Sequence, residues 1–338
     1  MNIPTVTHNG LSFINLNKPT DEQIRFLNKN FGFSMLNLED YLYKTQIPKM
    51  ETYKDYALLV MDIPYILQSS KQKKEKAIGK PFFIPNAISN RITLPIFPKA
   101  ARKKRISVGE IDFFIGKDYV VVLHDESTPQ IDELFEMCKI TSKHREELMG
   151  KGPVFLLYRM IDILVDSAFS YIEDITTTID SIDRQIEDSR SASVIEDISM
   201  TRRNIVVFET MIKPALPIFA DLEKGKYKEL NGEMMPYWSN ILDHLQKIWE
   251  RLEDNKELIQ GISSSHESIL SNRSNELVKF FTVLTAMSFP FVIVNNLYSM
   301  NVRGLPYAES PWIVWVLFLL ILSGGFAVIA YFKYRDWL

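Results

Sequence analysis

Two long hydrophobic runs without a formal charge lie near the C-terminal end of the chain. The first covers residues 280–297 and the second covers residues 312–332. A helix needs about 20 apolar residues to cross the hydrocarbon core of a bilayer. The second run meets this length, whereas the first is shorter and contains Pro290, Asn295 and Asn296. The pattern predicts two transmembrane helices. Because the first contains polar residues, we expect it to lie at an interface with protein or water.

The charges that flank the two runs predict their orientation. Lys333 and Arg335 follow the second run, whereas the loop between the runs, residues 301–311, carries only Arg303 and Glu309 as charged residues. Because Lys and Arg are enriched in cytoplasmic flanks, we expect both termini in the cytoplasm and the loop outside. The chain is therefore expected to be an integral protein of the inner or plasma membrane, with the lipid bilayer as a partner.

A heptad-like seam precedes the first run. Its positions follow steps of three and four at Ile241, Leu245, Ile248, Leu252, Asn255, Ile259, Ile262, His266 and Ile269. This spacing is typical of helices that pack side by side, and His266 is interpreted as a packing residue. No proline interrupts the stretch between Pro236 and Pro290. The sequence predicts one helix of roughly 60 residues, about 90 Å long, that joins a stalk to the first transmembrane helix.

A helical hairpin with an acidic face is expected before the stalk. Apolar residues follow helical spacing after Gly152-Pro153. The other face of this helix carries Asp162, Asp166, Glu173, Asp174, Asp180, Asp183, Glu187 and Asp188. These acids form either an ordinary solvated face or a field of one sign that gathers cations near a pore mouth.

The N-terminal part of the chain has the mixed pattern of an α/β domain. Strands rich in branched and aromatic residues are predicted at residues 11–16, 56–67, 110–116 and 118–124. Thr20 is a predicted helix N-cap, and Gly116-Lys117 is a predicted hairpin turn. The basic segments 71–80 and 99–105 are either solvated loops or contacts with anionic lipid or with acidic helices.

These patterns divide the chain into seven expected parts. They are an α/β domain at residues 1–150, an acidic helical hairpin at 151–232, a stalk helix at 233–276, a first transmembrane helix at 277–300, an outer loop at 301–311, a second transmembrane helix at 312–332 and a cytoplasmic tail at 333–338. Two helices cannot enclose a channel for a hydrated ion. A transporting form would therefore be an oligomer in which several copies contribute one polar helix to a shared axis.

Composition and motifs exclude several classes of protein. The net charge of −3 gives no reason to expect a nucleic acid partner. The single cysteine, Cys138, excludes an internal disulfide and fits a reducing compartment. The N-terminus has no pattern of a cleavable signal peptide. No phosphate-binding glycine loop, His/Cys metal spacing or nucleophile elbow is present, and the histidines are scattered singly. We therefore expect neither an enzyme nor an organic cofactor.

The segment that follows the first run, Tyr298-Ser299-Met300-Asn301, resembles the Tyr-Gly-Met-Asn that ends the first transmembrane helix in the CorA family of magnesium transporters. Further segments resemble the family in the same order, at residues 15–23, 31–33, 38–40, 47–53, 152–166, 202–203 and Pro290. The resemblance implies a homopentamer with an α/β/α cytoplasmic domain, long stalk helices and two C-terminal transmembrane helices, of which the first lines the pore.

The resemblance also implies an outer pore mouth at Tyr298, Ser299, Met300 and Asn301, where Asn301 presents a ring of side-chain oxygens. Neutral oxygens suit Mg²⁺, which sheds its water reluctantly. Ser299 stands where the family has glycine, and glycine permits a closer backbone approach or an unusual backbone angle. Selectivity for magnesium is therefore left open. Glu309 is the only acid of the outer loop.

Helical turns counted inward from Asn301 predict the remaining pore-lining positions. They are Asn296 or Leu297, Val292 or Val294, Phe289, Thr285, Phe281 and Val278. This face contains no acid, so ions would pass hydrated or be held by amide and carbonyl oxygens. Phe289, Phe281 and Val278 would form apolar constrictions that gate by dewetting.

Three functions remain open. The first is passive influx of divalent cations, most simply Mg²⁺, gated by regulatory cations between cytoplasmic domains; in the family, loss of such magnesium opens the pore. Asp62, Asn240 and Asp243 are the candidate regulatory residues. The second keeps the fold but carries zinc, cobalt or nickel, or exports ions. The third is a non-conducting membrane sensor or scaffold, which Ser299 and the acid-poor loop would fit.

Overall fold

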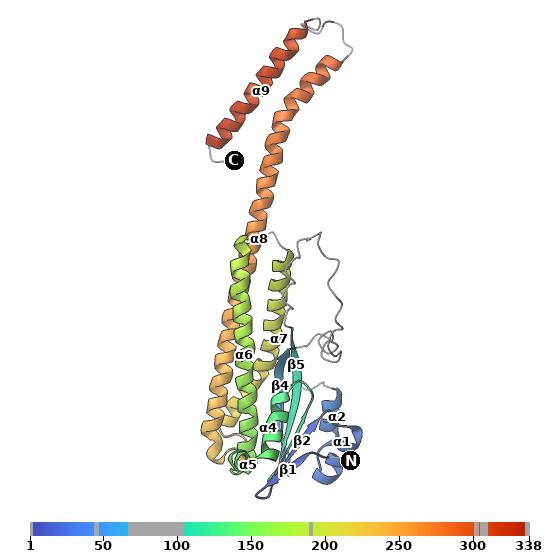
Figure 1. Ribbon diagram of the computed structural model, residues 1–338, viewed down its shortest axis with the longest axis vertical. Helices are drawn as coiled ribbons and strands as arrows, with labels where there is room; N and C mark the ends of the chain where they lie inside the picture. The colour runs from blue at the N-terminus through green and yellow to red at the C-terminus, as the bar shows by residue number, and fades with distance from the viewer. Residues whose placement is uncertain are drawn as a thin grey trace, which may run out of the picture. The chain divides into compact units, whose positions relative to one another are not determined.

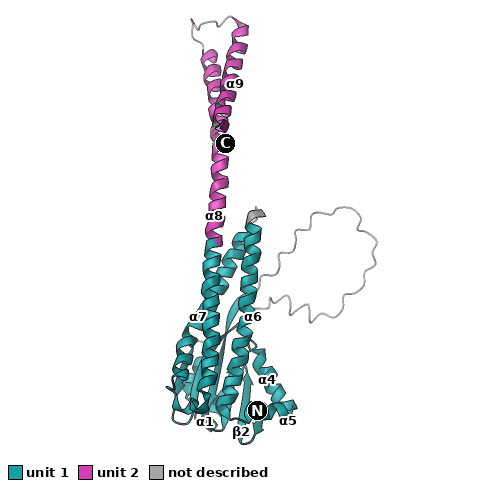
Figure 2. Ribbon diagram, turned by 90° about the vertical axis from the view of Figure 1, so that its left-hand side faces the viewer, with its two compact units in different colours: residues 1–261 teal, residues 262–338 magenta. Residues whose placement is uncertain are grey.

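The computed structural model describes residues 3–43, 47–66, 105–188, 192–300, 304 and 310–334. The chain divides into two compact units, Met1–Gly261 and Ile262–Leu338, which Figure 2 colours separately. The basic segment 71–80 lies outside the described residues, and so does the segment 99–105 except for Arg105.

Within the described residues of unit 1, six strands form one sheet in the order β1-β2-β6-β5-β4-β3. The strands are β1 (Thr5–His8), β2 (Leu11–Asn17), β3 (Lys49–Thr52), β4 (Ala57–Ile66), β5 (Ile106–Ile115) and β6 (Tyr119–His124). β2 and β6 pair in parallel, whereas the other neighbours are antiparallel. The central strands are buried almost throughout, as expected when helices cover both faces of a sheet.

One face of the sheet is covered by α1 (Asp21–Phe31) and α2 (Met35–Tyr43). Leu27 of α1 and Leu38 of α2 are fully buried in the same core cluster as Val60 and Phe114 of the sheet. The predicted N-cap is confirmed, because the Thr20 side chain accepts from the backbone N–H of Gln23 in a capping box.

The other face is covered by α4 (Pro129–Ile140), α5 (Ser142–Met149), α6 (Pro153–Asp188) and α7 (Ala192–Glu223), as Figure 1 shows. Phe135 of α4 lies edge-on to Phe13 of β2, with ring centroids 5.1 Å apart. α7 packs on β4 and β5. The expected α/β/α arrangement is therefore present.

α8 (Met235–Ser299) is a single helix of 65 residues, which confirms the predicted continuous helix. It follows two short 3₁₀ turns, η1 (Lys228–Leu230) and η2 (Gly232–Met234). In unit 1 it packs with α6 and α7: Tyr237 lies 4.8 Å from Tyr158 of α6, and Trp238 lies 6.2 Å from Phe219 of α7, between ring centroids. The seam residues Ile241, Leu245, Ile248, Leu252, Asn255, Ile259, Ile262 and His266 are all buried.

Unit 2 contains the second part of α8 and α9 (Pro311–Tyr334). The two stretches run antiparallel, because Met287 of α8 meets Gly325 and the later Phe291 meets the earlier Phe318. Among the described residues, the helix that contains α8 is the one long and apolar enough to cross a membrane; its most apolar window of 18 residues has a mean hydropathy of 2.0 and is not buried. The apolar stretch described within α9, Trp315–Ala327, is shorter.

Some elements had no clear sequence signal. The edge strands β1 and β3 have four residues each, too few for a visible alternation of polar and apolar positions. The strands that were predicted from residues 11–16, 56–67, 110–116 and 118–124 are present as β2, β4, β5 and β6, and the predicted hairpin joins β5 to β6.

Candidate ion pathway and metal site

The predicted pore-lining residues of α8 lie on an exposed face, which none of the residues that the structure describes covers. Val278, Phe281, Phe289 and Val292 are 51–61% exposed. Thr285 and Asn296 are exposed as well. Exposed apolar side chains in such numbers indicate a surface that contacts lipid or another protein.

The opposite face of α8 contacts α9. Met287 approaches Gly325, where an added Cβ would lie 3.1 Å from its Cε atom, and the rings of Phe291 and Phe318 are 5.4 Å apart. Val294 is half-buried on the same side of the helix. At 3.6 residues per turn, these positions lie about half a turn from the predicted pore face. Of the two alternatives Val292 and Val294, the structure therefore places Val294 on the α9 side.

The hydroxyl groups on the exposed face bond back to their own helix. Thr285 Oγ1 donates to the Phe281 carbonyl at 2.8 Å, and Ser299 Oγ donates to the Asn295 carbonyl at 2.6 Å. Ser299 is the last residue of α8 and does not have a positive φ. The serine is therefore accommodated as an ordinary helical residue, and its backbone does not require the conformational freedom of glycine.

The described part of the expected outer mouth ends at Met300. Met300 is 56% exposed, and Tyr298 is half-buried on the side of α8 that faces α9. Asn301 and Glu309 lie outside the described residues.

The candidate regulatory residues are not joined in the structure. Asp62 is half-buried on β4, opposite Glu110 of β5, and burial raises the pKa of its carboxyl to about 6. Asn240 and Asp243 are exposed on α8. Among the described residues, no hydrogen bond or ion pair connects Asp62 with Asn240 or Asp243.

A cluster of metal-ligating side chains joins α6 to α8 instead. Asp162 and Asp166 of α6 and His244 of α8 offer ligand atoms that all lie within 4.8 Å of one another. His244 Nδ1 is buried, makes no hydrogen bond and lies 3.5 Å from Asp166 Oδ1. The prediction that both acids lie on an outward face is wrong for Asp162, which is only 9% exposed. The spacing of four residues places Asp162 and Asp166 on one side of a helix, but no local pattern indicated that His244 lies beside them.

The donor set of this cluster suits a divalent cation. Burial is the largest cause that raises the pKa of Asp162, and the neighbouring Asp166 raises it further, while Arg159 at 3.1 Å lowers it. A bound cation would stabilise both carboxylates. Mg²⁺ prefers oxygen ligands alone, whereas an imidazole suits zinc, cobalt and nickel.

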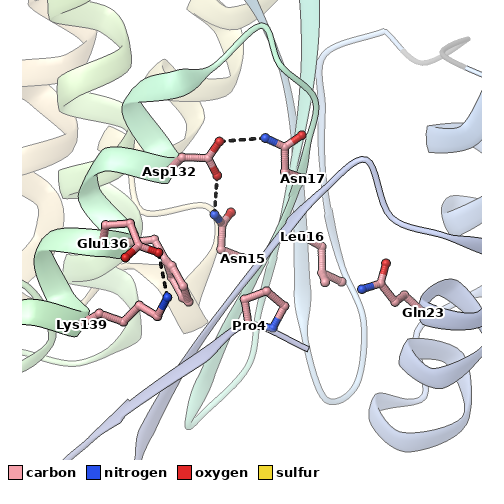
Figure 3. A pocket seen from close by; sticks show the side chains of 9 residues that line it. Pro4, Asn15, Leu16, Asn17, Gln23, Asp132, Glu136 and Lys139 are labelled. Carbon is pink, nitrogen blue, oxygen red and sulfur yellow. Dashed lines mark hydrogen bonds and ion pairs between the residues drawn. The ribbon is translucent and has the colours of Figure 1, made fainter. Parts of the chain in front are cut away.

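A hollow of about 290 Å³ lies between β2, α1 and α4 (Figure 3). Both carboxylate oxygens of Asp132 accept side-chain amide hydrogens, from Asn15 and from Asn17, at 2.7 Å each. The buried His124 lies with its Nε2 2.8 Å from Asn15 Oδ1, and burial lowers its pKa. Asp132 thus connects α4 to β2, which is a structural role, and the other acid of the hollow, Glu136, pairs with Lys139 of the same helix.

Comparison with known families decides the identity of the chain. A family model described as "CorA-like Mg2+ transporter protein" matches residues 85–334, which is most of the sequence. The chain belongs to the CorA-like family. The long helix, the C-terminal helix and the N-terminal α/β domain described above are the expected parts of a member.

Individual CorA-like relatives are distant, and they cover between about half and nearly all of the chain. The Cobalt/magnesium transport protein CorA of Thermotoga maritima is 23% identical over 91% of this chain and 78% of its own. The Divalent cation transporter CmaX of Pseudomonas aeruginosa is 25% identical over 55% of this chain and 57% of its own. The structure of the CorA magnesium transporter from Methanocaldococcus jannaschii aligns with a TM-score of 0.74 at 16% identity, covering 99% of this chain and 98% of that one. The relatives support a divalent-cation transporter, and the aligned structure shows the shared fold.

Proposed function

We propose that this chain is one subunit of a membrane channel that admits divalent cations, most simply Mg²⁺, down their electrochemical gradient. The observation that carries the proposal is the uncharged face of α8 opposite α9. Val278, Phe281, Thr285, Phe289, Val292 and Asn296 make up this face. The face combines apolar residues, which suit a gate that opens when water enters it, with the Thr285 hydroxyl and the Asn296 amide, which can form hydrogen bonds with water.

The pore in this proposal needs several copies of the chain. One helix face cannot surround an ion, and closed rings of identical subunits satisfy this need. A homopentamer is the assembly that the family resemblance favours. The exposed faces of α8 would then meet around one axis, while α9 and the remaining surface of α8 would contact the bilayer.

The proposed membrane spans are residues 277–300 and 312–332, with both termini in the cytoplasm. This orientation is supported by Lys333 and Arg335 after the second span and by the few charges of residues 301–311. Residues 1–150 and 151–232 would then form the cytoplasmic body and residues 233–276 the stalk.

Selection is proposed to begin at Ser299, Met300 and Asn301. An amide oxygen from Asn301 of each copy would accept hydrogen bonds from the water shell of an arriving ion, because Mg²⁺ dehydrates reluctantly. Glu309 is the only acid in the expected outer loop, so the loop would attract cations weakly.

A regulatory divalent cation is proposed for the cytoplasmic unit. Asp162, Asp166 and His244 supply a suitable donor set, and Asp243 is the direct neighbour of His244 on α8. Asn240 and Asp243 are exposed beside it and would be open to a second copy, with Asp62 as a more distant candidate. The imidazole favours zinc, cobalt or nickel over Mg²⁺ as the regulator, and it also supports these ions as alternative cargo.

The proposal is tested by Mg²⁺ uptake into proteoliposomes with an inside-negative potential. Asn301→Ala is expected to lower the uptake rate by about tenfold or more, because each copy loses an acceptor for the water shell. Asn272→Ala, which removes an exposed amide from α8 outside the predicted pore face, is the matched control and should transport normally.

Uptake of zinc, cobalt and nickel is measured in the same vesicles. Preference for one of these ions would support the alternative cargo. If the native chain carries none of the four ions and Ser299→Gly does, the channel proposal fails for the native protein and the sensor function is favoured.

A further inference from the structure

A chain of hydrogen-bonded side chains begins and ends on α4. Thr128 is the residue before this helix, and Asp132 lies in its first turn. Thr128 Oγ1 lies 2.8 Å from Nδ1 of His124 at the end of β6, and the other ring nitrogen, Nε2, lies 2.8 Å from Oδ1 of Asn15 on β2. Asn15 Nδ2 then donates to Asp132 at 2.7 Å (Figure 3). The start of α4 is therefore attached to two strands through one imidazole ring.

The ring of His124 is closed off from water. His124 and Thr128 are 0% exposed, and Asn15 is 5% exposed. Buried polar groups need hydrogen-bond partners inside the protein, and a ring nitrogen donates or accepts according to whether it carries a hydrogen. The partners of Nδ1 and Nε2 therefore decide which protonation states the ring can adopt.

Nε2 faces acceptors only. The Asp132 carboxylate accepts the hydrogen of Asn15 Nδ2, so the oxygen of the same amide points to the ring. Oδ1 of Asp132 is a further acceptor, 3.3 Å from Nε2. Nε2 consequently carries a hydrogen whether or not the ring is charged.

Nδ1 faces two partners of different kinds. The Thr128 hydroxyl can donate or accept, whereas the backbone carbonyl of Asp125, 2.9 Å from Nδ1, can only accept. When Nδ1 has no hydrogen, the hydroxyl donates to it. When Nδ1 has a hydrogen, it donates to the carbonyl, and the hydroxyl can turn toward the same carbonyl, 3.5 Å away. Rotation of one hydroxyl thus allows the site to hold the ring with or without a second proton.

The surroundings make the charged form the weaker of the two. Burial is the largest cause that lowers the pKa of His124, and the bond to the Asp125 carbonyl and the negative charges of Asp132 and Asp125 offset it only in part. These two acids are the charged groups that act on the ring among the described residues. The nearby Lys18 and Glu126 pair with each other at 2.8 Å. A proton on Nδ1 therefore weakens the attachment of α4.

We propose that His124 is a proton-binding site in unit 1, which holds the first turn of α4 to the sheet while the ring is neutral and loosens it when the ring is protonated. The proton comes from solvent when α4 opens locally, binds Nδ1 and displaces the hydrogen bond from Thr128. Histidine is suited to this role, because its proton is exchanged near physiological pH. The inference does not depend on the proposed function, since all of these residues lie in unit 1.

The test compares the native chain with His124→Gln, which keeps a polar side chain and cannot take up the proton. Hydrogen exchange of the α4 amides is measured by mass spectrometry on the detergent-solubilised full chain at about pH 7.5 and about pH 5.5, with labelling times scaled to the intrinsic exchange rate. Opening of α4 in the native chain should increase up to about tenfold at the lower pH, because an exposed histidine with a pKa near 6.5 is protonated there. His124→Gln should open equally at both.

Thr128→Val tests the Nδ1 site independently, because it keeps the shape of the side chain and removes the hydroxyl that donates to the neutral ring. Loss of this donor raises the pKa of His124 in the folded chain. Thr128→Val should therefore open α4 more readily at about pH 7.5 and show a smaller increase at about pH 5.5 than the native chain does. His144→Gln, which changes a half-buried histidine of α5, is the matched control and should behave as the native chain.

The same increase of opening in His124→Gln as in the native chain would place the proton elsewhere and overturn the proposal. Stronger protection of α4 at the lower pH in the native chain would overturn it as well, because the charged ring would then hold the helix. An unreduced increase in Thr128→Val would contradict the exchange of partners at Nδ1. If the melting temperature shows that one variant does not fold, the other still decides.

Discussion

α8 has two different surfaces along its length. In unit 1, Trp238, Ile241 and Leu245 are at most 1% exposed, and rings from α6 and α7 pack against Trp238. In unit 2, Phe281 and Phe289 are about 60% exposed although they are just as apolar. The apolar side chains of the first stretch are buried within their own chain. Those of the second stretch remain exposed, as expected for a face that contacts lipid or other copies of the chain. One end of this helix therefore serves the folding of its own chain, and the other presents an apolar surface to lipid or to another protein.

The largest stability effect should come from the covered stretch. Trp238→Ala removes a fully buried ring and its indole hydrogen bond to the Leu230 carbonyl, so unfolding free energy should fall by about 3–5 kcal/mol. Phe289→Ala, in the uncovered stretch, should change the stability of the monomeric chain little. Chemical denaturation of both detergent-solubilised variants checks the contrast. Equal losses would show that α8 does not have two surfaces of different purpose.

A smaller effect on stability is expected from Asp62, which lies half-buried on β4 in unit 1. Because burial raises its pKa to about 6, the folded chain retains a proton that the unfolded chain has released. Stability should therefore fall as the pH rises from about 4 to about 6. Asp62→Asn should remove this fall and stabilise the chain at pH 7 by about 3 kcal/mol. The free energy of unfolding of the native chain and of the variant is measured across that pH range. The same pH dependence in both would show that Asp62 is not the group that causes the fall.

The smallest effect concerns the metal cluster between α6 and α8. Zinc or cobalt at ten times its dissociation constant should stabilise the folded chain by about 1.4 kcal/mol. Asp166→Asn and His244→Ala should abolish this gain, while Asp180→Asn, which changes an exposed acid of the same helix, should retain it. The gain is measured as the shift in melting temperature between samples with the metal and samples with a chelator. A gain that persists in His244→Ala would place the ion elsewhere.

Local signals in the sequence were sufficient for much of the fold. Thr20 predicted a helix start because capping depends on residues a few positions away. The seam predicted α8 because helical spacing is a property of one segment. His244 and Asp162 could not be paired in this way, since they meet only when α6 and α8 pack together.

The candidate pore face was predicted by counting helical turns from Asn301, which the family resemblance places at the outer mouth, but its environment required the structure. Spacing left Val292 and Val294 as alternatives, because both lie within reach of a helical count. Contact between α8 and α9 separates them, as Val294 is half-buried and Val292 is 51% exposed. The hydrogen bond from Ser299 to the Asn295 carbonyl was also not predicted, because the motif indicated where the helix ends but not how the serine hydroxyl bonds.

Val292→Cys and Val294→Cys test whether the exposed face of α8 lines a shared pore. The native Cys138 is buried, so a polar thiol reagent should reach only the introduced cysteine. Mg²⁺ uptake is measured before and after the reagent is added. We predict that the reagent blocks uptake through Val292→Cys and leaves uptake through Val294→Cys unchanged. Block of uptake through Val294→Cys with unaffected uptake through Val292→Cys would show that the exposed face of α8 does not line the pore.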